Sequence, residues 1–140
     1  KPVEYKPTGD IAIEGKPEQY KTLTANHDDL EDKNGLGKIS YQWQRSQTGT
    51  NIFTDIDQAT SKTYTLTQSD VGYLLKVVVS YKDQQKAQYA SDYSIDSSLT
   101  GEVINFNDMP TGDVTIDGSI DGVFDQDVTL FYELVSQWQV

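Results

Sequence analysis

Oxygen-bearing side chains gather in one acidic stretch of this 140-residue chain, at positions 26–35. Asp29, Asp32 and Asn34 follow one another closely there, and Gly35 allows the backbone to turn sharply. Calcium takes about six to eight oxygen ligands, many of them from carboxylates and amide carbonyls. The stretch lacks the closing Glu of a full EF-hand loop, and such turns also occur simply as solvated turns. It therefore predicts a Ca²⁺ site, with a solvated turn as the alternative.

A second oxygen-rich point is the pair Asn107 and Asp108, just before Pro110. These side chains could join loop carboxylates of an adjoining domain in a Ca²⁺ site that stiffens the joint. The alternative is an Asx turn ahead of the proline. The carboxylates that follow could add ligands or serve only solubility; they are Asp113, Asp117, Asp121, Asp125 and Asp127.

The residues needed for catalysis are scarce. His27 is the only histidine, there is no cysteine, and no Gly-x-Ser-x-Gly stretch is present, so a hydrolytic triad lacks its parts. No glycine-rich phosphate loop occurs, and nothing selects one pair of carboxylates for glycoside hydrolysis. We therefore expect a protein that is not an enzyme.

Charge and composition narrow the partners. A net charge of -11 argues against nucleic acid and anionic membrane surfaces, which need clustered Lys and Arg, and it favours cations. No apolar run approaches the roughly 18 residues of a membrane span, so we expect neither membrane insertion nor a signal peptide in this sequence. With Tyr 9, Phe 4 and Trp 2, the chain has the aromatic surface to fold.

These candidate ligands need a scaffold, and residues 39–44 show what it is. Ile39, Tyr41 and Trp43 alternate with polar residues, which is the period of a half-buried antiparallel strand. Burying an indole ring contributes roughly 4–6 kcal/mol before opposing terms, so Trp43 is predicted to anchor the core.

Further short strands are expected on both sides of the tryptophan strand. The longest, 73–82, points Tyr73, Leu75, Val77, Val79 and Tyr81 to one face. Several short strands with turns between them, and a tryptophan on the third, predict an all-β fold: an immunoglobulin-like antiparallel β-sandwich. The remaining strands are expected at 11–13, 20–25, 52–56, 62–67 and 87–93.

An internal repeat sets the domain plan. The stretch at 7–15, which opens Pro-Thr-Gly-Asp and closes on Gly, returns at 110–118 after 103 residues. That period is the size of one sandwich module. The chain therefore divides into a sandwich repeat at 7–106, a linker at 107–112 and the start of a second repeat at 113–140.

The order of several short motifs resembles the tandem immunoglobulin-like repeats of very large bacterial surface and RTX-type secreted adhesins. The connector 107–112, Asn-Asp-Met-Pro-Thr-Gly, resembles the Asn-Asp-Ala-Pro-Thr-Gly linker between those repeats. Two positions depart from the family: Asn34 stands where Asp is usual, and Tyr5-Lys6 stands where Asn-Asp precedes the first Pro-Thr-Gly. The matching motifs are residues 22–25, 32–37, 39–44, 64–72 and 79–83.

The resemblance implies a non-catalytic extender repeat of a secreted or cell-surface bacterial adhesin, stabilised by Ca²⁺. Its partners would be neighbouring repeats of the same polypeptide and a host or matrix ligand. The alternative is a carbohydrate-binding β-sandwich module, because exposed tyrosines can stack on sugar rings. The candidates for that role are Tyr20, Tyr89 and Tyr93.

Overall fold

The computed structural model describes residues 2–106. The chain divides into two compact units, Lys1–Phe106 and Asn107–Val140, and the described residues belong to the first. The predicted linker at 107–112 and partial repeat at 113–140 lie outside the described residues and stay predictions. The strands are β1 (Ala12–Glu14), β2 (Thr22–Asn26), β3 (Ser40–Gln47), β4 (Thr54–Asp55), β5 (Thr63–Thr65), β6 (Tyr73–Lys82) and β7 (Asp92–Asp96), with a 3-10 turn, η1 (Gln68–Asp70), between β5 and β6.

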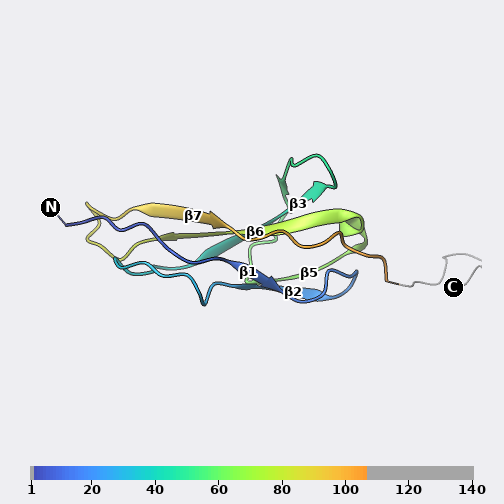
Figure 1. Cartoon of the computed structure of the whole chain (residues 1–140), viewed down its shortest axis with the longest axis horizontal. Helices are drawn as coiled ribbons and strands as arrows, with labels where there is room; N and C mark the ends of the chain where they lie inside the picture. Colours follow the sequence, from blue (N-terminus) through green and yellow to red (C-terminus); the bar gives the residue numbers. More distant parts are fainter. Residues whose placement is uncertain (1, 107–140) are drawn as a thin grey trace, which may run out of the picture. The chain divides into compact units, whose positions relative to one another are not determined.

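Two antiparallel sheets form the unit (Figure 1). One has three strands in the order β1-β2-β5, and the other has four in the order β4-β3-β6-β7. This distribution of consecutive strands over two sheets is that of an immunoglobulin-like sandwich, with the short fourth strand on the sheet of β3. The predicted all-β antiparallel β-sandwich is confirmed.

The core lies between the sheets and is centred on Trp43, whose side chain is fully buried. Its indole Nε1 donates to the Ser61 carbonyl oxygen at 2.8 Å, and its ring stacks on Tyr64 with 5.9 Å between centroids. From β6, Leu75 and Val77 face the same core, as the alternation in the sequence predicts. The indole is thus both sealed from water and satisfied in its one polar group.

An ion pair with a buried carboxylate fastens η1 to β3. The Asp70 carboxylate, wholly inaccessible, accepts from Arg45 Nη1 at 2.8 Å, from the Tyr64 hydroxyl at 2.7 Å and from the Thr67 backbone N–H at 2.8 Å. An unpaired buried charge would be costly, so this set of donors is what allows an aspartate here.

The last strand lies later in the chain than the sequence suggested. Alternation predicted it at 87–93, but β7 spans Asp92–Asp96, and residues 84–90 form a turn. β6 continues its pairing to Asp83, whose backbone N–H donates to the Ser91 carbonyl at 2.9 Å, and this fixes Tyr81 opposite Tyr93. The register of the long strand therefore overrides the local apolar pattern of the turn.

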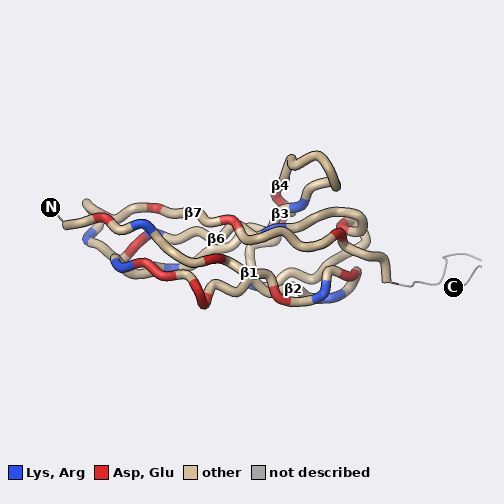
Figure 2. Tube along the Cα trace, in the orientation of Figure 1, with Lys and Arg blue, Asp and Glu red and all other residues tan. Residues whose placement is uncertain are grey.

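The described chain begins and ends at opposite ends of the unit (Figure 1). Beyond β7, Val103 and Ile104 join β6 to the β1–β2 connection: the Val103 N–H donates to the Tyr73 carbonyl at 2.9 Å, and the Ile104 N–H donates to the Pro17 carbonyl at 3.0 Å. Acidic and basic residues are spread along the whole unit and do not form one charged face (Figure 2). Within residues 2–106, no helix has the length and apolar character needed to cross a bilayer.

Candidate functional site

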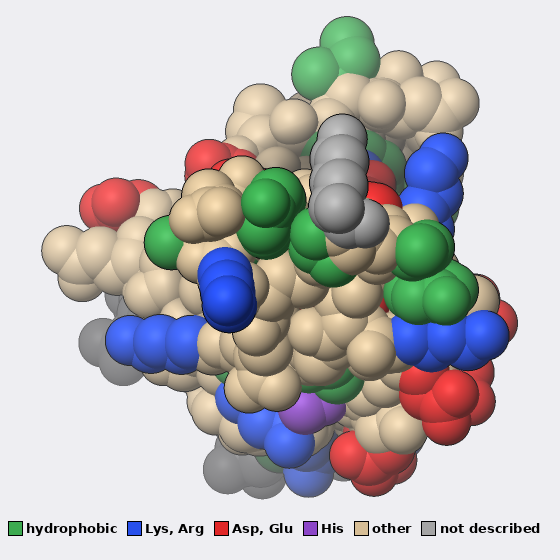
Figure 3. All heavy atoms as spheres, turned by 90° about the vertical axis from the view of Figure 1, so that its left-hand side faces the viewer, with side chains coloured by type: hydrophobic (Ala, Val, Ile, Leu, Met, Phe, Trp, Pro, Cys, Tyr) green, Lys and Arg blue, Asp and Glu red, His purple; other side chains and the backbone are tan. Residues whose placement is uncertain are grey.

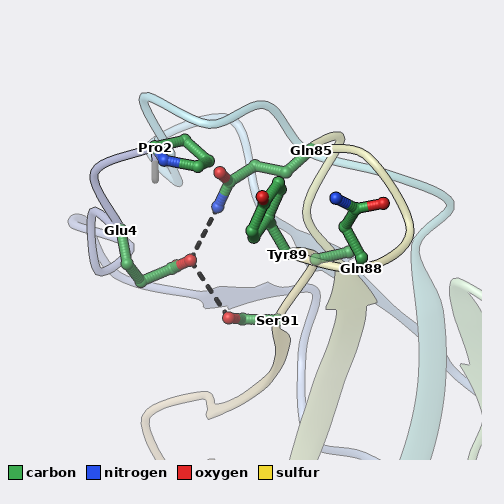
Figure 4. Close-up of a pocket in the computed structure, with 7 residues that line it drawn as sticks. Pro2, Glu4, Gln85, Gln88, Tyr89 and Ser91 are labelled. Carbon is green, nitrogen blue, oxygen red and sulfur yellow. Dashed lines mark hydrogen bonds between the residues drawn. The ribbon is translucent and has the colours of Figure 1, made fainter.

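The richest polar arrangement lies at the N-terminal end, where residues 2–6 run beside the β6–β7 connection. Glu4 is its centre. One carboxylate oxygen accepts from Gln85 Nε2 at 2.7 Å and from Ser91 Oγ at 3.0 Å (Figure 4). The other accepts a short hydrogen bond from the Tyr93 hydroxyl. Three donors thus hold one carboxylate in a single orientation.

The β6–β7 connection brings those donors together. The Asp83–Ser91 backbone bond closes its base, and the Tyr89 N–H donates to the Lys86 carbonyl at 2.8 Å within the turn. This places Gln85 and Ser91 on the same side, facing the N-terminal segment (Figure 4).

Two tyrosines extend the arrangement inward. Tyr81 and Tyr93 are register partners, with ring centroids 5.7 Å apart, and the Tyr81 hydroxyl donates to Asp32 at 2.5 Å. The hydrogen bond to Glu4, with burial and the negative charge of Glu4, raises the pKa of Tyr93 to about 12. Burial, followed by the hydrogen bond to Asp32, raises the pKa of Tyr81 well above its usual value. Both phenols are therefore neutral donors at ordinary pH.

A third carboxylate, Asp83, is almost enclosed beneath the connection. Burial alone would raise its pKa, but hydrogen bonds from the backbone and side chain of Gln85 outweigh that effect and hold the pKa below its usual value. The end of the unit thus carries three oriented carboxylates: Glu4, Asp32 and Asp83.

Beside Glu4 lies a cavity of about 320 Å³. Tyr89, Gln85 and Gln88 form one side of it and Pro2 lies across from them (Figure 4). Figure 3 views this end of the unit and shows apolar side chains exposed among basic and acidic ones. The cavity joins an aromatic ring to amide, hydroxyl and carboxylate groups, which is a set suited to binding and orienting a small polar molecule.

The predicted calcium ligands in the acidic loop all have protein partners. Asp29 accepts from the Asp10 N–H at 3.1 Å, and Asp32 accepts from Tyr81 and from the Asn34 N–H, the latter at 2.7 Å. Asn34 accepts from the Tyr5 N–H at 2.7 Å and donates to the Val3 carbonyl at 3.1 Å. The loop therefore ties down the N-terminal segment.

No group of three or more His, Cys, Asp and Glu side chains that could hold a metal occurs in the described part of the chain. Asn107 and Asp108 lie outside it. Calcium binding at the five predicted residues, Asp29, Asp32, Asn34, Asn107 and Asp108, stays a prediction.

The three candidate sugar-stacking tyrosines have different surroundings. Tyr20 is 57% exposed and lies 6.0 Å from the Phe106 ring at the far end of the unit. Tyr93 is half-buried and its hydroxyl is bound to Glu4. Tyr89 lines the cavity. His27 contacts Tyr41, with 3.2 Å between its Nε2 and the tyrosine hydroxyl.

Sequence reasoning did not find Glu4, Gln85 or Ser91. Glu4 precedes the repeated stretch and belongs to no periodic pattern, and its partners are 81–89 residues away in the sequence. The available signal was the composition of the turn, where consecutive glutamines follow a long apolar strand.

The strand order defines this unit as a module of the immunoglobulin-like sandwich class. A family model described as a domain of unknown function (DUF8696) matches residues 14–96, and the chain belongs to that family. No curated protein matches the sequence.

Proposed function

We propose that this chain is a non-catalytic extender repeat of a secreted or cell-surface bacterial adhesin, and that its immediate partners are neighbouring repeats of the same polypeptide. The observation that carries the proposal is the placement of the two ends of residues 2–106 at opposite ends of the sandwich (Figure 1). A module of this kind adds its full length when copies are joined in succession.

Both ends are firmly attached, as a load-bearing module requires. At the N-terminal end, the Thr8 and Glu31 backbones exchange two hydrogen bonds, each 2.8 Å long. At the other end, the Gln19 N–H donates to the Ile104 carbonyl at 2.9 Å, and the Phe106 N–H donates to the Gln19 side chain at 3.3 Å. A pull on the ends therefore loads hydrogen bonds between segments that are distant in sequence.

The repeat register supports a short junction. With a period of 103 residues, Asn107 is the counterpart of Glu4, the residue that fastens the N-terminal segment to its own module. Phe106, the residue before it, is fastened to the first module. Neighbouring copies would then be joined without spare residues, and a junction without spare residues transmits reach better than a long polar linker.

Duplication of the module in phase tests the proposal. A chain in which residues 4–106 occur twice in succession, followed by 107–140, is compared with the original by small-angle X-ray scattering. We expect the largest interatomic distance to increase by about one module length, because the copies follow one another end to end.

The control has a short Gly/Ser insertion after the first Phe106, which should broaden the distance distribution. A duplicated chain that folds back to nearly the original largest distance would rule out the extender. Identical distributions with and without the insertion would rule out the stiff junction.

A further inference from the structure

We propose that the cavity between residues 2–4 and the β6–β7 connection binds a neutral pyranose sugar of one or two rings, with Tyr89 as the stacking platform. This inference does not depend on the extender function, because reach comes from the placement of the chain ends and sugar binding from the cavity.

Unused hydrogen-bonding groups surround the cavity. Three side-chain groups that line the space have no hydrogen-bond partner within residues 2–106. They are the Tyr89 hydroxyl, the side-chain amide of Gln88 and the side-chain carbonyl oxygen of Gln85. A polar ligand could therefore be bound without displacing internal bonds. Amide, hydroxyl and carboxylate groups next to one aromatic ring match a pyranose, which has hydroxyl groups on its rim and C–H groups on its faces.

Glu4 adds a fixed acceptor. Its carboxylate is already oriented by Gln85, Ser91 and Tyr93, so a sugar hydroxyl could donate to it without the loss of side-chain freedom that a mobile group would suffer. A hydrogen bond to a charged acceptor is also stronger than a neutral one.

Charge and size select the ligand class. Among the described residues, no Lys or Arg lines the cavity and a carboxylate does, so anionic sugars and phosphates are disfavoured. The volume of about 320 Å³ is at the small end of the range for ligand sites, which suits one or two rings. The polar lining argues against a purely apolar ligand.

The test uses the full chain and saturation-transfer NMR with neutral monosaccharides and disaccharides, and with their uronic acid counterparts. We expect saturation of at least one neutral sugar, strongest at the C–H protons of one face. Tyr89→Ala should weaken binding about tenfold by removing the stacking surface. Tyr89→Phe keeps the ring and should retain most of the affinity.

Tyr20→Ala, which removes an exposed tyrosine at the opposite end, is the matched control and should bind as the original does. If backbone amide spectra show Tyr89→Ala to be unfolded, Gln88→Ala, at an exposed position, replaces it with an expected several-fold loss. The proposal is overturned by the absence of binding to any neutral sugar, by a preference for uronic acids, or by equal losses in the cavity variant and in Tyr20→Ala.

Discussion

Individual side chains at the N-terminal end show how this acidic protein uses its carboxylates. Within residues 2–106, Glu4, Asp32 and Asp83 form no salt bridge with lysine or arginine; each instead accepts hydrogen bonds from neutral tyrosine, glutamine, serine or backbone donors. Bonds from neutral donors to a charged acceptor are shielded less by salt than exposed ion pairs are. The network at this end of the unit therefore holds its geometry without ion pairs.

The bonded tyrosines give a prediction for alkaline pH. Tyr93 has a pKa of about 12, and so does Tyr64, whose pKa is raised by burial and by its hydrogen bond to Asp70. The pKa of tyrosine in an unfolded chain is about 10. A group whose pKa is raised by folding stabilises the folded state fully at pH values below its unfolded-state pKa. This contribution is lost as the pH rises through its folded-state pKa. We expect stability to fall between about pH 10 and pH 12.

Urea midpoints measured across that pH range check this expectation. Tyr93→Phe should show a shallower fall than the original chain, because one of the perturbed groups is removed. Equal slopes for the two proteins would show that Tyr93 titrates normally.

Asp70 provides a second residue-scale prediction. Asp70→Ala leaves Arg45, whose side chain is only 30% exposed, without its 2.8 Å partner and removes the acceptor of Tyr64. Loss of one member of a buried pair costs about 3–5 kcal/mol of unfolding free energy, and the partial exposure of Arg45 favours the lower end. Chemical unfolding followed by circular dichroism measures it. The exposed Asp57→Ala is the control and should change stability by less than about 0.5 kcal/mol.

At this scale, sequence reasoning found the core residues and missed the polar network. Trp43 and Leu75 lie in alternating stretches, so their burial follows from local pattern. Glu4 was missed because its role depends on Gln85, Ser91 and Tyr93, which only the completed fold brings near it. A carboxylate that accepts three bonds looks the same in sequence as a solvated one.

Among the elements, the turns that flank β1 explain why the repeated stretch has glycine at fixed positions. Gly9 and Gly15 both adopt positive φ, at 96° and 115°, and a Cβ at either would collide with the backbone of the neighbouring chain segment. In the similar stretch at 110–118, Gly112 and Gly118 stand at the same positions. The repeat thus preserves the residues that the backbone requires, as well as the apolar alternation between them.

Alanine substitution of two glycines separates the cost of a positive φ from the cost of a steric clash. Gly49 has φ 86°, and no atom lies within 4 Å of the position that a Cβ would take there, so Gly49→Ala should cost only the backbone term of about 1–2 kcal/mol. Gly9→Ala adds a contact of 2.0 Å with the Asp29 carbonyl oxygen and should cost clearly more. Urea unfolding of both variants measures the difference. Equal losses of unfolding free energy in the two variants would mean that the backbone at Asp29 moves aside at no cost.

The sequence predicts the bounds of a strand where the strand's own residues mark one apolar face. It does not predict them where pairing with a neighbouring strand decides where the strand begins. β6 matches its expected bounds because every second residue from Tyr73 to Tyr81 is apolar, which marks one face along the whole strand. β7 was displaced because Ala87 and Tyr89 resemble strand residues locally, while pairing with β6 places the strand at Asp92–Asp96. The turn chemistry of consecutive glutamines is too weak a signal to compete with that pattern.

For the whole molecule, the main prediction from the sequence that awaits measurement is calcium binding. The acidic loop and the pair Asn107 and Asp108 predict that Ca²⁺ raises thermal stability. Differential scanning calorimetry of the full chain in excess calcium and in chelator checks this, and a higher melting temperature with calcium is expected.

The control is Asp108→Ala, which would lower the calcium-dependent shift if the linker holds the ion and leave it unchanged if the loop does. Equal melting temperatures in calcium and chelator would contradict the prediction. Because Asp32 and Asn34 already hold the N-terminal segment, the linker variant tests the ion without disturbing those bonds.

The long sequence separation between Glu4 and its three partners also bears on how the module is made. During synthesis, residue 4 leaves the ribosome before Tyr93, which follows 89 residues later. Asn34 emerges early enough to bind the backbone beside Glu4, but the Glu4 carboxylate has none of its three partners until almost all of residues 2–106 have emerged. The polar network at this end of the fold is therefore expected to close last, once β7 has paired with β6.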